Sequence, residues 1–282
     1  MSKNHTKSLR VSRVRAEIAK HAFICFVLGC SLFPLYMIFN ISLKTNKQFF
    51  NQPWMLTVPF HWENWIQGWN LVGGTIFNTL FICLSATALT LIFAILASYF
   101  FARFHMPGAK VIWAMFLVLM LMPGIANLIP LFSLLKGLGL LNTFSALIIC
   151  GTAGGQVFCV YVLRNFIEDI PKEMFEAAEM DGAGHLQQII NIVLPMSGPI
   201  ISTLAILRFI GEWNSFVLPL IVLRDEIKFP IGVALYQLEG AYVKEWGPMM
   251  AAYAIASIPL IIIFLFTMRL FVKGLSSGAL KG

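Results

Sequence analysis

Two ionisable residues interrupt a long apolar stretch, and their spacing suggests chemistry more directly than any other pair in this chain. Arg208 and Glu212 are four residues apart, so on a helix they share a face and can form an ion pair. Trp213 and Asn214 follow directly, so an aromatic ring and an amide lie beside the carboxyl group. We take these four residues as candidates for a solute-binding, pore-lining site. For the first two, a mutual ion pair lining the interior of the helix bundle is the first interpretation, and contact with a solute or a gating function is the alternative.

A second patterned stretch, residues 168–197, places charged and small residues between two apolar runs. Its turn signals predict two short helices. Asp169 and Pro171 are start signals for the first, and Gly182 suits the left-handed conformation that ends it. The second is expected from about Gly184 to residue 194, where the following proline helps to end it.

The first of these helices carries an acidic surface. Glu176 and Asp181 offer acceptors to a basic partner, and the small pair Ala177-Ala178 allows another surface to approach the backbone. Helices that rest on a membrane usually carry Lys and Arg on the polar face, because the cytoplasmic leaflet is anionic. The sequence therefore favours a protein partner over the membrane surface for this helix.

Signatures of catalysis are missing from the sequence. It contains no GxxxxGK[ST] phosphate loop, no HExxH motif and no GxSxG motif, and its five His and five Cys residues are scattered. We therefore expect no catalytic residue, no metal site and no cofactor in this chain. Any energy source has to be a separate subunit.

The composition is that of a membrane protein. Of 282 residues 59% are hydrophobic and only 12% are charged, and the mean hydropathy is +0.81, whereas soluble domains carry roughly 25% charged residues. The net charge is +7, and much of it lies in the first 20 residues. No aromatic residue is interleaved there, so we interpret this charge as a topology signal and not as a nucleic-acid site.

Six apolar runs are long enough to cross a bilayer, which needs roughly 20 residues as a helix. Because the backbone in lipid must bond internally, the sequence predicts an all-α integral membrane fold. If the N-terminus is cytoplasmic, 13 of the 20 Lys and Arg residues fall on the cytoplasmic side and six on the other, so both termini are expected inside. The predicted spans are Ala22–Ile41, Gly74–Phe101, Val111–Phe132, Phe144–Phe166, Pro199–Leu223 and Gly247–Phe271.

Three segments of the charged stretch together resemble a known motif. They read Glu176-Ala177-Ala178, then Asp181-Gly182-Ala183, then Ile192-Val193-Leu194-Pro195. This is similar to the EAA loop of ABC importer permeases, in the version of the carbohydrate-uptake, MalG-like family. One departure is Ile189, where that family often has Phe. The resemblance covers roughly residues 20–282 and includes the stretch that begins at Glu212.

The resemblance implies a six-helix, type I ABC importer transmembrane domain. It further implies a permease subunit that translocates a sugar or sugar-like solute across a bacterial or archaeal cell (inner) membrane. The implied partners are a second permease subunit, two ATPase subunits that bind ATP and Mg, and an extracytoplasmic solute-binding protein. The implied ATPase-coupling residues are Glu176, Ala177, Ala178, Asp181 and Gly182.

The expected organisation is a basic cytoplasmic tail (1–21), a first transmembrane helix with its external loop (22–73), the ABC type-1 transmembrane domain (74–271) and a cytoplasmic C-terminal tail (272–282). A stand-alone secondary transporter is one alternative, but it would need ion-coupling carboxylates at membrane depth, and only Glu212 qualifies. A membrane-embedded hydrolase is the other, and it lacks a catalytic constellation.

Overall fold

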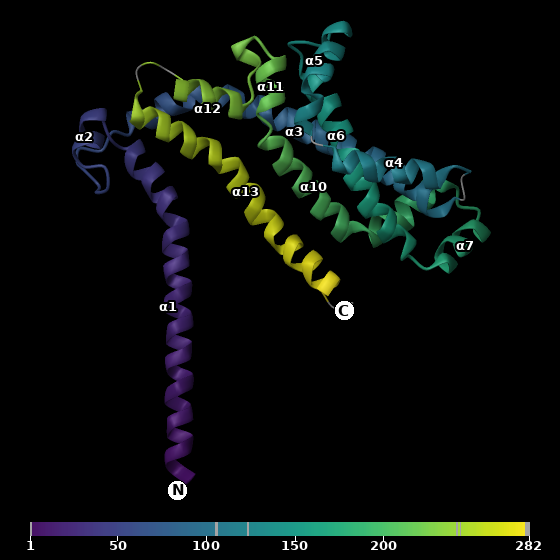
Figure 1. Ribbon diagram of the computed structural model, residues 1–282, viewed down its shortest axis with the longest axis horizontal. Coiled ribbons are helices and arrows are strands. Elements are labelled where there is room, and N and C mark those ends of the chain that lie inside the picture. Colours follow the sequence, from purple (N-terminus) through teal and green to yellow (C-terminus); the bar gives the residue numbers. More distant parts are fainter. Residues whose placement is uncertain (1, 105–106, 123, 241, 243, 280–282) are drawn as a thin grey trace. The chain divides into compact units, whose positions relative to one another are not determined.

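The computed structural model describes the backbone of residues 2–104, 107–122, 124–240, 242 and 244–279, and their side chains except at 2–16, 125 and 268–279. Every regular element in this part of the chain is helical (Figure 1), which confirms the predicted all-α class. The chain divides into two compact units, Met1–Leu71 with Ala241–Ile255 and Val72–Gly240 with Ala256–Gly282. Most side chains of the two predicted tails, 1–21 and 272–282, lie outside the described residues.

Four helices of the described chain are long and apolar enough to cross a membrane. They match the first, second, fourth and sixth predicted spans. The second begins eleven residues before its predicted start and is therefore longer than one bilayer crossing requires. The four are α1 (Ser2–Ser42), α3 (Glu63–Arg103), α6 (Phe144–Glu168) and α13 (Trp246–Ala279).

The third predicted span is interrupted and is not one continuous helix. It consists of α4 (Ala109–Leu121), a 3-10 turn η1 (Gly124–Asn127) and α5 (Leu128–Gly137). The residue before a proline is disfavoured in the helical region. Met122 precedes a proline and accordingly has extended backbone angles.

The fifth predicted span is also broken. Helix α10 (Gly198–Trp213) ends before a short connection, and α11 (Val217–Val222) follows it. In a continuous helix Pro219 would clash with the carbonyl of Ser215. Because of the break, Pro219 is the third residue of α11. The first four N–H groups of a helix have no acceptor within the helix, so a proline, which has no N–H, is tolerated at this position. The total of six spans stays a prediction.

The larger unit, Val72–Gly240 with Ala256–Gly282, has a core near each end of α6. One core joins Ile167 near the end of α6 to Phe175 and to Tyr99 of α3. The other joins Leu147 near its start to Val222 of α11. The remaining helical elements of this unit are α7 (Lys172–Met180), α8 (His185–Gln188), the π-helical turn η2 (Ile189–Val193), α9 (Leu194–Met196), the 3-10 turn η3 (Glu226–Lys228) and α12 (Ile231–Gly240). The short helix α2 (Asn46–Asn51) belongs to the smaller unit.

The smaller unit is organised around a buried lysine. Lys44 is 1% exposed, and its ammonium donates to the carbonyl oxygens of Gln52 (2.7 Å) and Met55 (2.6 Å). Asn64, in the first turn of α3, donates to the Lys44 carbonyl at 3.0 Å. A buried charge is tolerated only where such partners replace water. The lysine therefore holds the loop between α2 and α3 in a fixed fold.

Asn142 forms a clasp in the larger unit, between the start of α6 and the segment after α11. The backbone angle φ of Asn142 is positive, 61°. Its side-chain oxygen accepts from the backbone N–H groups of Arg224 (3.0 Å) and Asp225 (3.1 Å), and its amide donates to the Asp225 carboxylate at 2.7 Å. The Lys228 ammonium and the Asn142 amide together lower the pKa of Asp225. This clasp ties α11 to the start of α6.

We predict that Asn142→Gly and Asn142→Ala both lower the melting temperature of the detergent-purified protein. The Gly variant loses the side-chain hydrogen bonds, at roughly 1–3 kcal/mol. The Ala variant also strains the left-handed backbone, at about 1 kcal/mol more. Thermal unfolding should therefore rank wild type above Gly and Gly above Ala. An Ala variant as stable as the wild type would contradict the clasp.

Candidate functional site

The acidic helix predicted in the charged stretch is α7. It begins at Lys172, with Pro171 as its N-cap residue and Glu173 in its positive first turn. Asp169, expected as a start signal, instead caps the C-terminus of α6. The sequence prediction was therefore right about the helix and wrong about this one signal.

Gly182 ends α7 as predicted. Its φ is +79°, a left-handed conformation that glycine adopts without strain. Its N–H donates to the Glu179 carbonyl at 3.0 Å, and the next N–H, of Ala183, donates to the Ala178 carbonyl at 2.8 Å. These two bonds are the Schellman motif, which satisfies carbonyls that a helix end leaves free. The glycine thus fixes the reversal between α7 and α8, and we call residues 171–196 the coupling hairpin.

The second helix of the coupling hairpin is irregular. Helix α8 continues into the π-helical turn η2, whose last bond runs from the Leu194 N–H to the Ile189 carbonyl. Pro195 has no N–H for the carbonyl four residues earlier, which is a recognised cause of such local irregularity. The helix was expected to end near Pro195, but α9 includes this proline and ends at Met196. An 82° bend then leads into α10.

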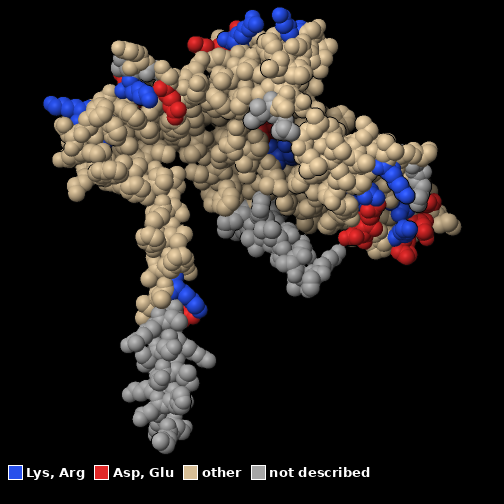
Figure 2. Space-filling view, in the orientation of Figure 1, with Lys and Arg blue, Asp and Glu red and all other residues tan. Residues whose placement is uncertain are grey.

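The outer face of α7 is open to solvent in this chain. Glu176, Ala177, Asp181 and Gly182 are exposed and Ala178 is half-buried. Figure 2 shows acidic side chains gathered on the surface where α7 lies, with Lys and Arg beside them. Met180 is 89% exposed between these polar residues. This face offers negative charge, small side chains and one apolar contact to a partner.

The inner face of α7 carries an anchor that the sequence reasoning missed. Phe175 is 0% exposed, and the Arg103 guanidinium at the end of α3 lies 4.0 Å above the centre of its ring. A cation over an aromatic face is attractive by roughly 0.5–2 kcal/mol. The sequence signal was a single large aromatic residue among the charged and small residues of this helix. Phe175 therefore fastens the coupling hairpin to the transmembrane helices.

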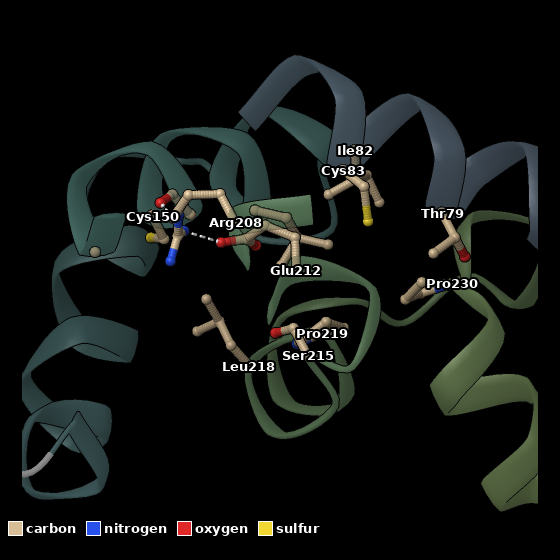
Figure 3. Close-up of a pocket in the computed structure, with 13 residues that line it drawn as sticks. Thr79, Ile82, Cys83, Cys150, Arg208, Glu212, Ser215, Leu218, Pro219 and Pro230 are labelled. Carbon is tan, nitrogen blue, oxygen red and sulfur yellow. Dashed lines mark hydrogen bonds and ion pairs between the residues drawn. The ribbon is translucent and has the colours of Figure 1, made fainter. Parts of the chain in front are cut away.

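The predicted pair in the fifth span is present. Arg208 and Glu212 form an ion pair on α10, with side chains 19% and 12% exposed. The Arg208 guanidinium also donates to the Gly151 carbonyl of α6 at 2.9 Å. Figure 3 shows the two side chains reaching toward each other beside the cavity. Charge at membrane depth is thus balanced within the chain.

The glycines of α6 make room for this pair. A Cβ on Gly151 would lie 2.7 Å from a Glu212 carboxylate oxygen, and a Cβ on Gly155 would lie 2.7 Å from the Arg208 Cζ. The Gly151–Gly155 spacing suggests close packing of helix backbones, but the structure shows charged side chains in the space. Spacing alone could not distinguish these two uses.

A cavity of about 210 Å³ lies beside the ion pair. Helix α3 contributes Thr79 and Cys83, and Ser215 lies in the break between α10 and α11 (Figure 3). The other two predicted residues are not among its lining. Trp213 is 5% exposed and stacks on Phe209, while Asn214 caps α10. The full lining is Thr79, Ile82, Cys83, Leu147, Cys150, Gly151, Gly154, Arg208, Glu212, Ser215, Leu218, Pro219 and Pro230.

Comparison with known proteins gives one family. Residues 90–277 match the model of the binding-protein-dependent transport system inner membrane component. The probable ABC transporter permease protein YurM of Bacillus subtilis is 32% identical over 272 residues, which are 94% of this chain and 89% of that protein. The melibiose/raffinose/stachyose import permease protein MelC of the same organism is 30% identical over 98% of both chains.

A solved structure shares the fold. It is a bacterial ABC transporter involved in the import of the acidic polysaccharide alginate, of which one chain superposes with a TM-score of 0.81. The match covers 92% of this chain and 97% of that one, at 23% sequence identity.

We predict that Arg208→Met destabilises the protein more than the double variant Arg208→Met/Glu212→Met. The single change leaves a buried carboxylate unpaired, which costs about 3–5 kcal/mol, whereas removing both charges leaves an apolar contact that is often neutral. Thermal unfolding in detergent measures both. A double variant no more stable than the single one would contradict the pairing.

Proposed function

Because the chain belongs to the family of binding-protein-dependent transport system inner membrane components, we propose that it is the permease subunit of an ATP-driven importer for a sugar or sugar-like solute. Its full-length relatives with assigned solutes support the solute class, since MelC is a melibiose/raffinose/stachyose import permease. The diacetylchitobiose uptake permease NgcG of Streptomyces coelicolor supports the same class.

The observation that carries the proposal is the coupling hairpin. Its outer face presents Glu176, Asp181 and small residues, while Phe175 on the opposite face is fully buried against the transmembrane helices. A helix exposed on one side and anchored on the other can transmit movement of a bound partner. We infer that this partner is an ATPase subunit, which binds ATP and Mg and docks on Glu176, Ala177, Ala178, Asp181 and Gly182.

The cavity beside the ion pair is the proposed solute-facing site of this subunit. Its wall combines the charged groups of Arg208 and Glu212 and the Ser215 hydroxyl with the apolar side chains of Leu147 and Leu218. Sugars present hydroxyl groups and an apolar ring face, so the polar groups of the wall can bind the hydroxyl groups and the apolar side chains can contact the ring face. A second permease subunit completes the pathway in this proposal, and an extracytoplasmic solute-binding protein delivers the solute.

This function requires a defined orientation. We infer that the chain lies in a bacterial or archaeal cell (inner) membrane with both termini in the cytoplasm, because the Lys/Arg bias then agrees with the positive-inside rule. The coupling hairpin faces the cytoplasm in this orientation, where ATP is available. The solute moves inward, and hydrolysis occurs in the separate ATPase subunit.

We predict that Gly182→Leu abolishes coupled uptake in the reconstituted four-subunit complex, while Gly182→Asn retains most of it. A Cβ at this position meets no atom of this chain within 4 Å, so within the chain the change adds backbone strain at φ +79°, roughly 1–2 kcal/mol for an ordinary residue. On the proposed docking face the Leu side chain also adds bulk against the partner. Asn tolerates the left-handed region. Uptake is measured with a panel of melibiose, raffinose, trehalose and diacetylchitobiose, and ATP hydrolysis is measured in parallel.

Membrane insertion of both Gly182 variants is the control for this experiment. Full uptake by the Leu variant would count against the coupling function of the hairpin. Failure of the wild-type complex to take up any sugar of the panel with its cognate binding protein would count against the proposed solute class.

We predict that Leu218→Trp blocks solute passage by filling the cavity, and that it reduces uptake at least tenfold while ATP hydrolysis continues. Leu220→Trp on the same helix is the matched control, because Leu220 is exposed and does not line the cavity. The same sugar panel and ATPase assay provide the measurement. Equal uptake by both variants would show that the cavity is not part of the solute pathway.

A further inference from the structure

We propose that Tyr99 is a positioning residue that makes the coupling hairpin and α3 move as one body during transport. The proposal rests on the proposed function, because it concerns how that hairpin drives the membrane helices. Tyr99 lies one turn before the end of α3 and is 1% exposed. A buried phenol hydroxyl needs a hydrogen-bond partner, and here both partners belong to the hairpin.

The hydroxyl group of Tyr99 joins two residues of α8. It donates to the Gln188 side-chain oxygen at 2.6 Å, and it lies 3.1 Å from Nδ1 of His185. A phenol has one hydrogen to donate. Since that hydrogen goes to Gln188, the hydroxyl accepts from His185, which therefore carries a hydrogen on Nδ1. One atom of α3 thus bonds to two positions of the hairpin.

Gln188 extends this connection to the docking helix. It is 1% exposed, and its amide nitrogen donates to the Ala183 carbonyl at 3.3 Å and to the Glu179 carboxylate at 3.4 Å. Glu179 is on α7 and is exposed. The chain of bonds therefore runs from the partner-facing helix through α8 to α3, and we call Glu179, Gln188 and Tyr99 the amide relay.

Helix α3 carries the relay to the cavity. Thr79 and Cys83 of the same helix line the cavity, and Cys83 lies 16 residues before Tyr99, which is about 24 Å along a helix. On the way, Ser98 donates to the Val160 carbonyl of α6 at 3.2 Å and Gln156 of α6 donates to the Thr90 carbonyl at 3.2 Å. These bonds hold α3 against α6, so a displacement at Tyr99 moves the cavity wall.

Tyr99→Phe tests the relay by removing one hydroxyl and leaving the ring to pack against Phe175. In the full complex, with whichever panel sugar supports wild-type uptake, we expect the sugar imported per ATP hydrolysed to fall at least fivefold. Tyr161→Phe is the matched control, because it removes a phenol hydroxyl from α6, where the ring stacks on Trp113 at 5.5 Å. Its transport ratio should equal that of the wild type.

Gln188→Met provides the second arm. If the relay acts as a unit, Gln188→Met and the double variant with Tyr99→Phe should show the same transport ratio as Tyr99→Phe alone. A wild-type ratio in Tyr99→Phe would overturn the proposal, and so would additive losses in the double variant. A purely structural function would lower uptake and ATP hydrolysis together, and that result would also overturn it.

A measurement without a relay variant covers the case in which Tyr99→Phe does not fold. Spin labels at Lys172→Cys, exposed at the start of α7 and outside the proposed docking residues, and at Ile92→Cys on α3, in a chain with Cys25, Cys30 and Cys150 replaced by Ser, report the distance between the two helices. The proposal requires the same distance in the nucleotide-free and ATP-trapped complex. A nucleotide-dependent change in this distance would overturn the proposal. The proposed import function is tested separately, by the uptake assay.

Discussion

Polar groups at membrane depth have no water to bond with, so each needs a partner from the chain itself. The Nη2 group of Arg208 meets this constraint with the Glu212 carboxylate and the Gly151 carbonyl. Asn78 of α3 meets it by donating to the carbonyls of Ile227 and Phe229. These bonds decide which helices must lie together. The break between α10 and α11 is acceptable under the same constraint, because the Asn214 N–H bonds back to Ile210 and the Ser215 N–H to Glu212.

The break between α10 and α11 and the glycines of α6 together create the cavity, at a position that side chains would fill in a bundle of unbroken helices. Gly151 and Gly154 of α6 leave the volume that larger side chains would occupy. The turn at Ser215 places Leu218 and Pro219 of α11 in the cavity wall. The Asn142 clasp then holds α11 in place through the segment that follows it. A cavity whose wall combines charged and apolar groups thus depends on residues whose individual propensities oppose a continuous helix.

Local patterns predicted local features. The positive φ at Gly182 and the pairing of Arg208 with Glu212 each follow from short-range spacing. The position of Trp213 could have been predicted better, since one residue turns a helix by about 100° and carries it off the face of Glu212. The burial of Phe175 and Tyr99 could not be predicted in the same way. Their contacts join residues far apart in the chain, by 86 and 89 positions for the Tyr99 hydroxyl, and one sequence contains no signal for such pairs.

Two routes connect the coupling hairpin to the cavity, and they differ in stiffness. Helix α10 carries Arg208 and Glu212 but joins the hairpin through an 82° bend at Ser197. Helix α3 runs without a break from Thr79 to Tyr99, so a force applied at its end reaches the cavity wall directly. In the proposed import function, the continuous helix α3 is therefore the route that would move the cavity wall with the hairpin.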